Sequence, residues 1–214
     1  MEDFLFWNNI DTIDKISDIL SNGQVIVGSS DTVFGLLANT TKDGFEKLNF
    51  IKQRNTKPYI VLIDNIDKLK YLTTLKPSAA LLNLFQQCWP GPLTLILPAC
   101  PNLPESLRSF GDTIAVRIPN HAGLLQLLSR FDGLFSTSAN LAGDPVPNSF
   151  AEIDPLIIEN VAAIVLDDQL NINSPNSIQP STILDCTSDR IKLVRAGAYS
   201  LDELQQIYGQ QILS

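Results

Sequence analysis

The sequence predicts one α/β domain, of the α+β kind, that spans residues 1–214 and is built on a mixed sheet. Two observations lead to this fold class. Apolar runs with helical spacing interleave with short apolar runs that are typical of strands, yet they do not form clean βαβ pairs. Several strands follow one another in the last third of the chain, which favours a mixed sheet. No linker or repeat divides the 214 residues, which suffice for one sizeable core.

The periodicity and the stop signals define each element. A helix is expected over residues 10–20, where Ile13, Ile16 and Leu20 share a face and Ser-Asn-Gly ends it. A buried strand over residues 24–30 follows. The other helices are expected at residues 42–53, 66–72, 78–89, 122–131 and 200–209. The other strands are expected at residues 59–64, 93–99, 113–119, 134–140, 162–168, 181–187 and 191–197.

The charge and the N-terminus restrict the function classes. The 15 Lys and Arg against 23 Asp and Glu give a net charge of -8. This balance argues against a general nucleic-acid binder but leaves room for a small cationic pocket. The N-terminal MEDFLFWNN has no basic segment, so no signal peptide is expected, and no apolar run is long enough to span a bilayer. The three widely spaced cysteines suit a cytoplasmic location.

Motifs for the common cofactors are absent from the sequence. His121 is the only histidine and no cysteine pair accompanies it, so no zinc site is expected. Neither GxGxxG nor GxxxxGK[ST] occurs, so we expect no NAD, no flavin and no common phosphate loop. A Ser-His-Asp triad would lack the GxSxG elbow.

Two basic segments attract attention in this acidic chain. Lys52 and Arg54 stand where a helix ends, and they can bind a phosphate or carboxylate if the chain unwinds there. Cations that complement the helix dipole are the alternative, which this stretch alone favours. Arg117 lies inside the apolar strand TIAVRIP, where a charge is costly unless it is paired or binds a ligand. We expect a substrate carboxylate, and little protein charge, to hold it.

Two hydroxyl-rich segments follow strands. They are GSSDTVFGL, residues 28–36, and STSAN, residues 136–140. Ligands of α/β sheets bind at such strand ends. For STSAN in isolation, a turn that satisfies its own backbone is at least an equal alternative.

Together these segments resemble the YrdC-like threonylcarbamoyl-AMP synthase family. SSDTVFGL, KQR, WPGPLTLIL, TIAVRIP, STSAN, PSTILD and VRAG occur in its order and spacing, over about residues 23–197. The resemblance implies a twisted mixed sheet, flanked by helices, around a concave and positively lined cleft. It also implies the short form of the family, without the extra C-terminal domain.

The resemblance further implies a reaction. L-threonine, bicarbonate and ATP condense to threonylcarbamoyl-AMP and pyrophosphate, with ATP as a substrate and Mg²⁺ expected on its phosphates. A partner protein, the tRNA threonylcarbamoyl transferase, then modifies adenosine in tRNA. Whether the chain itself contacts tRNA stays open.

Site residues follow from the same resemblance. The catalytic residues would be Lys52 and Arg54, as its KxR pair, and Ser138 and Asn140, as its SxN pair. The nucleotide would contact Arg54, Thr113, Ser138 and Arg195. Threonine would contact Ser30, Arg117, Ser136 and Ser181, with Asp31, Thr32 and Thr182 as further candidates. Both KxR cations are expected to reach solvent, as counter-charges for the ATP phosphates.

One segment departs from the family pattern. Members usually read Tyr-Pro-Thr where this chain has Gly28, Ser29 and Ser30. Without the proline we expect a mobile turn, nucleotide binding of ordinary strength, and threonine binding that is weak when ATP is absent. Ser29→Pro should tighten threonine binding. Two alternatives to the synthase remain open. They are a catalytically weakened nucleotide- or RNA-binding regulator, and a carbamoyl transferase with another acceptor.

Overall fold

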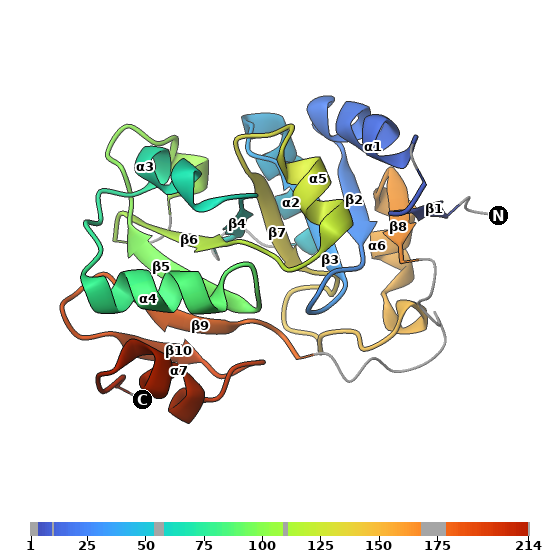
Figure 1. Cartoon of the computed structure of the whole chain (residues 1–214). Coiled ribbons are helices and arrows are strands. Elements are labelled where there is room, and N and C mark those ends of the chain that lie inside the picture. Colours follow the sequence, from blue (N-terminus) through green and yellow to red (C-terminus); the bar gives the residue numbers. More distant parts are fainter. Residues whose placement is uncertain (1–3, 10, 54–57, 109–110, 168–178, 214) are drawn as a thin grey trace.

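The computed structural model describes residues 4–9, 11–53, 58–108, 111–167 and 179–213. Within them, one twisted ten-stranded sheet has the order β1-β8-β2-β3-β7-β4-β6-β5-β9-β10 (Figure 1). The strands are β1 (Leu5–Phe6), β2 (Val25–Gly28), β3 (Gly35–Asn39), β4 (Ile60–Leu62), β5 (Leu93–Pro98), β6 (Thr113–Arg117), β7 (Leu134–Ser138), β8 (Ala163–Leu166), β9 (Thr182–Asp185) and β10 (Lys192–Arg195). Parallel pairs such as β4–β6 occur beside antiparallel pairs such as β3–β7, so the predicted mixed sheet is confirmed.

Helices cover both faces of the sheet. The α-helices are α1 (Thr12–Ser21), α2 (Lys42–Lys52), α3 (Leu69–Leu72), α4 (Ala79–Cys88), α5 (Ala122–Leu128), α6 (Pro155–Asn160) and α7 (Leu201–Tyr208). Because successive side chains of a strand point to opposite faces, Leu36 and Ala38 of β3 join the core under α2, α4, α6 and α7. Leu37 joins the second core, under α1 and α5, which lie side by side (Figure 1).

Each predicted helix and strand has a counterpart in the structure. A capping box of Ser200 and Glu203 begins α7. The elements β1, β3 and α6 were not predicted from the sequence. β3 reads Gly-Leu-Leu-Ala-Asn and is buried along its whole length. It therefore lacks the apolar-polar alternation and the β-branched residues that identify a strand. No helix in the described part of the chain is both long and apolar enough to cross a membrane.

Candidate active site

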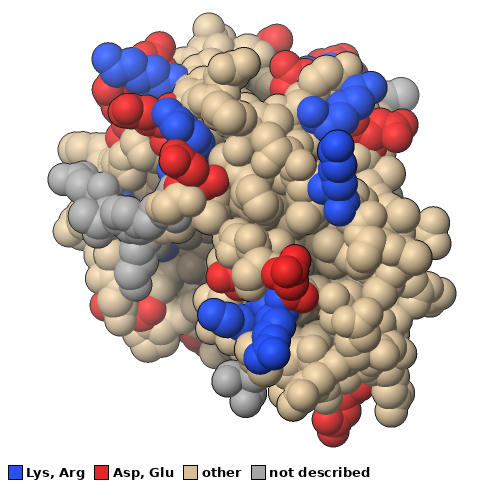
Figure 2. Space-filling view, turned by 90° about the vertical axis from the view of Figure 1, so that its left-hand side faces the viewer, with Lys and Arg blue, Asp and Glu red and all other residues tan. Residues whose placement is uncertain are grey.

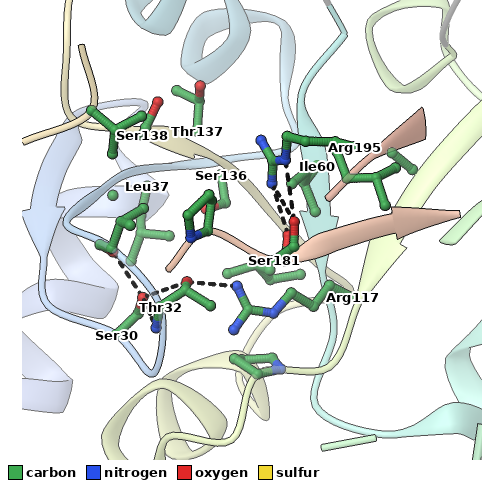
Figure 3. Close-up of a pocket in the computed structure, with 18 of the residues that line it drawn as sticks. Ser30, Thr32, Leu37, Ile60, Arg117, Ser136, Thr137, Ser138, Ser181 and Arg195 are labelled. Atoms are coloured by element: carbon green, nitrogen blue, oxygen red, sulfur yellow. Dashed lines mark hydrogen bonds between the residues drawn. The ribbon is translucent and has the colours of Figure 1, made fainter. Parts of the chain in front are cut away.

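A cavity of about 550 Å³ opens on the sheet face that carries α1 and α5. Its floor is a row of paired residues from neighbouring strands, namely Leu37, Ser136, Ile60, Ala115 and Ile96. Ser29 also lines the cavity, and the other polar lining residues are Ser30, Thr32, Arg117, Thr137, Ser138, Ser181 and Arg195 (Figure 3). The structure therefore brings together residues from both hydroxyl-rich segments and two arginines, in the concave cleft that was expected.

The turn between β2 and β3 forms one wall. The Ser30 hydroxyl donates to the Val33 carbonyl at 2.9 Å and lies 3.1 Å from the Thr32 hydroxyl. It also accepts from the Thr32 backbone N–H at 3.2 Å. Ser30 thus lines the cavity while it holds its own turn together.

Arg117 lies behind this turn, at the end of β6. Its guanidinium donates to the Gly91 carbonyl at 3.0 Å, to the Thr32 hydroxyl at 2.8 Å and to the Asp31 carboxylate at 2.5 Å. Both side chains of the ion pair are largely buried, Arg117 at 7% and Asp31 at 11% exposure. Burial lowers the pKa of Arg117, and the Asp31 charge opposes this effect. The expectation that little protein charge holds Arg117 is therefore wrong.

Arg195 stands on the opposite wall, beside Ser181 (Figure 3). Its Nη2 donates to the Ser181 carbonyl at 2.8 Å and to the Ser181 hydroxyl at 3.0 Å. Among the described residues it has no carboxylate partner within 4.0 Å. Burial and the nearby Arg117 charge both lower the pKa of Arg195. Arg195 thus brings a positive charge to the cavity that no described acid neutralises.

Lys52 does not reach the cavity surface. It is 1% exposed, and its ammonium donates to the Ser138 carbonyl at 2.7 Å, the Asn140 Oδ1 at 3.0 Å and the Asn140 carbonyl. The Ser138 hydroxyl also donates to Asn140 Oδ1, at 2.5 Å. The expectation of a solvent-reachable Lys52 is therefore wrong, because the ammonium shapes the STSAN loop from behind. Arg54 lies outside the described residues.

Two further sequence candidates lie away from the cavity lining. Thr113 begins β6 and lies on the same strand face as Ala115 and Arg117, beyond the lining residues. Thr182 is fully buried, and its hydroxyl donates to the Tyr199 carbonyl at 2.8 Å and accepts from the Tyr199 N–H at 2.9 Å. Thr182 therefore fastens the segment after Arg195 instead of facing a ligand.

Sequence reasoning missed a hydrogen-bonded group beside the turn, formed by Trp7, Ser29, His121 and Asp167. Asp167 bonds Ser29 at 2.9 Å and His121 at 2.9 Å. The His121 hydrogen bond lowers the pKa of Asp167, burial opposes this, and Ser29 adds to the lowering. Asp167 stands between the serine and the histidine, so this is not a nucleophile-base-acid triad. No local motif marks these residues, since they come from four distant segments.

Comparisons with known proteins give a consistent result. The model of the Sua5/YciO/YrdC family, described as "Telomere recombination", matches residues 18–197. The threonylcarbamoyl-AMP synthase of Pseudoalteromonas translucida is 35% identical over 185 residues, which cover 84% of this chain and 96% of that protein. The enzyme of the same name from Bacillus subtilis is 32% identical over 202 residues. This match covers 92% of this chain but 56% of that protein, so the chain spans about half the length of this relative.

Solved structures show the same relationship. The structure of P. abyssi Sua5 complexed with L-threonine aligns with a TM-score of 0.85 and 26% identity, over 100% of this chain and 62% of that chain. E. coli YciO aligns with a TM-score of 0.79 over 95% of this chain and 100% of its own. At 21% identity, the YciO likeness shows the fold alone.

Proposed function

Because the chain belongs to the Sua5/YciO/YrdC family, we propose that it is an L-threonylcarbamoyladenylate synthase. It condenses L-threonine, bicarbonate and ATP to threonylcarbamoyl-AMP and releases pyrophosphate. The observation that carries the proposal is the cavity, in which hydroxyls and two guanidinium groups converge above an apolar floor. Relatives named threonylcarbamoyl-AMP synthase support this function and give no support to a regulator or to a carbamoyl transferase with another acceptor.

The two walls suggest where the substrates bind. Threonine would lie against Ser30, Arg117, Ser136 and Ser181, with Asp31 and Thr32 behind them. The ATP phosphates carry the largest charge, so they would lie toward Arg195 and Ser138, with Thr113 and Arg54 as further contacts. A guanidinium offers a planar fork of donors to phosphate oxygens. The P. abyssi Sua5 complex with L-threonine supports an amino acid as one ligand.

The chemistry of this site is positioning and electrostatic stabilisation. The threonine amine and bicarbonate would form a carbamate with loss of water. A carbamate oxygen would then attack the α-phosphate of ATP, which forms the mixed anhydride and expels pyrophosphate, so negative charge moves to the leaving group. Fixed cations stabilise that charge without rearranging. Arg195 is suited to this role, and Lys52 and Asn140 would act by holding the loop that carries Ser138.

Mg²⁺ would arrive on the phosphates of ATP. The described residues contain no group of three or more His, Cys, Asp or Glu side chains that could hold a metal ion. Mg²⁺ commonly keeps waters and substrate phosphates as ligands. It would therefore bind here mainly through the ATP phosphates and not through a cluster of protein side chains. When bound, it would neutralise phosphate charge.

Transfer to tRNA adenosine would fall to a separate threonylcarbamoyl transferase, and the reaction would take place in the cytoplasm. The face in Figure 2 shows Lys and Arg side chains lying among Asp and Glu instead of forming one basic patch. Together with the net charge of -8, this supports a role that ends with the adenylate.

The proposal is tested by incubating the protein with ATP, bicarbonate and each amino acid in turn. We expect pyrophosphate release that requires both threonine and bicarbonate, and mass spectrometry should detect threonylcarbamoyl-AMP. Reactions without threonine, or with serine in its place, serve as controls. Pyrophosphate release that ignores the amino acid contradicts the proposed substrate.

A further inference from the structure

The hydrogen-bonded group beside the cavity joins the ends of three strands to a helix start. Trp7 follows β1, Ser29 follows β2, Asp167 follows β8, and His121 immediately precedes α5. These strands are neighbours in the sheet. The group therefore lies at the root of the turn that carries Ser30.

Hydrogen bonds hold both the backbone N–H and the hydroxyl of Ser29. Its N–H donates to the Val165 carbonyl at 3.0 Å. Its hydroxyl donates to Asp167 Oδ2 at 2.9 Å and accepts from Trp7 Nε1 at 3.1 Å and from the Asp167 N–H at 3.0 Å. A serine hydroxyl has one donor and two acceptor positions, so its capacity is full. Ser29 is also 3% exposed, which makes the loss of any of these bonds costly.

Asp167 also connects Ser29 to His121, in the segment after β6. Its Oδ1 lies 2.9 Å from His121 Nε2. His121 Nδ1 accepts from the Leu124 N–H at 3.1 Å, so the imidazole proton lies on Nε2 and points to Asp167. The Trp7 ring packs against the imidazole at 5.4 Å between centroids. Asp167 therefore accepts two hydrogen bonds, one from each side of the junction.

The same two segments meet a second time, closer to the cavity. The Asn120 N–H donates to Asp31 Oδ2 at 2.9 Å, and Arg117 donates to Asp31 Oδ1. The turn is thus fastened to residues 117–121 directly through Asp31 and indirectly through Asp167. Contacts at two points along the segment fix the orientation of the turn relative to it, whereas a contact at one point would allow the turn to rotate.

We propose that Asp167 is a positioning residue for threonine, which fixes the turn of Ser29 and Ser30 against the segment of Arg117 and His121. The proposal rests on the proposed function for the identity of the ligand. It assigns to hydrogen bonds the restraint that a proline supplies in the usual family pattern. The turn is then preorganised in the free protein, and binding costs less ordering of the chain.

Asp167→Asn is the decisive variant because an amide cannot replace the carboxylate here. Asparagine has the same shape but one acceptor oxygen. Ser29 and His121 each need an acceptor, and neither has a free position for an amide N–H. One of the two bonds must therefore break. Ser29→Ala breaks the same link from the other side, and Asp132→Asn, at an exposed residue without a described partner, is the matched control.

Steady-state kinetics would separate positioning from a merely structural role. We expect Asp167→Asn and Ser29→Ala each to raise the KM for threonine about 10-fold, with little change in the KM for ATP. The losses of the two single variants should not add in the double variant, since both changes act on the hydrogen bonds of Asp167. An unchanged KM for threonine in both single variants, or equal losses for threonine and ATP, overturns the proposal.

Two readouts need no turnover, so they separate this inference from the proposed function. His121 is the only histidine, and ¹⁵N NMR of its ring should show the Nε2–H tautomer in the wild type and an altered Nε2–H signal in Asp167→Asn. Amide exchange at residues 29–32 should become faster in Asp167→Asn and stay unchanged in Asp132→Asn. If exchange at residues 29–32 does not change, the positioning role is wrong. A wild type without threonine-dependent pyrophosphate release contradicts only the proposed function.

Discussion

The two arginines of the cavity differ in what holds them. Arg117 is buried and paired with Asp31, and backbone and hydroxyl groups take further N–H groups. Arg195 is more exposed than Arg117, and its described partners, the carbonyl and the hydroxyl of Ser181, are neutral. One cavity therefore contains a guanidinium whose charge is balanced by a carboxylate and a guanidinium whose charge no described acid balances.

This difference indicates two kinds of ligand. An arginine paired with a carboxylate can orient a ligand through its N–H groups while the pair carries little net charge. This suits the carboxylate of a zwitterionic amino acid. An arginine with neutral partners keeps its full charge for phosphates, whose attraction falls off less in a partly enclosed site than in water. Under the proposed function, Arg117 would therefore face the amino acid and Arg195 the nucleotide.

The largest effect is expected from Arg117→Leu. This change leaves the Asp31 carboxylate buried without its partner, so the free energy of unfolding should fall by about 3–5 kcal/mol. Urea denaturation measures it. The double variant Arg117→Leu/Asp31→Leu should recover part of the loss, because it removes the stranded charge. A single variant as stable as the wild type would show that the ion pair contributes nothing and would remove the contrast between the arginines.

Arg195→Leu should act on catalysis more than on stability. Loss of a charge contact made to the leaving phosphates should lower kcat/KM for ATP by about 10²-fold, or about 2.7 kcal/mol. Threonine binding, measured by titration calorimetry without nucleotide, should change little. Arg190→Leu, at an exposed arginine near the start of β10, is the control. An equal loss of threonine affinity would contradict the two-sided cavity.

Ser29→Pro tests the wall that carries Arg117. The initial expectation of a mobile turn that proline improves does not agree with the structure, because the Ser29 N–H and hydroxyl are all bonded. Proline has no N–H, so the Val165 carbonyl loses its donor, at a cost of about 1–3 kcal/mol. We expect lower thermal stability and weaker threonine binding than in Ser29→Ala, which keeps the N–H. Tighter threonine binding would restore the initial expectation.

The smallest expected effect is on the stability of the protein at low pH. The pKa of Asp167 is lowered in the folded protein, so its contribution to stability is present above the unfolded value of about 3.9 and is lost as pH falls through the folded value. Denaturation curves between pH 7 and pH 3 should show this loss. Asp167→Asn should start less stable and lose less on acidification, whereas identical slopes for both proteins contradict the assignment.

Much of this structure could be predicted from local pattern. Arg117 was a candidate because a charge inside the apolar strand TIAVRIP is costly unless it is paired or binds a ligand. In the structure Arg117 lines the cavity. Its pairing with Asp31 could not be read from the sequence, because 86 positions separate the two. For Lys52, too, local sequence gives the wrong environment. Its place at the end of a helix predicts exposure, and only tertiary packing against Asn140, 88 positions away, buries it.

The strand order has a consequence for how the chain is made. β2 to β7 lie in the first two thirds of the sequence, but β8 pairs with β2 and β9 pairs with β5. Until β9 leaves the ribosome, β5 presents an unpaired edge that can recruit a neighbouring chain. Contacts such as Leu93 with Thr182 also close long loops, which slows folding. Ser181 and Arg195 therefore join the cavity only after β5 and its earlier partners have been made, and the β5 edge stays open to neighbouring chains until then.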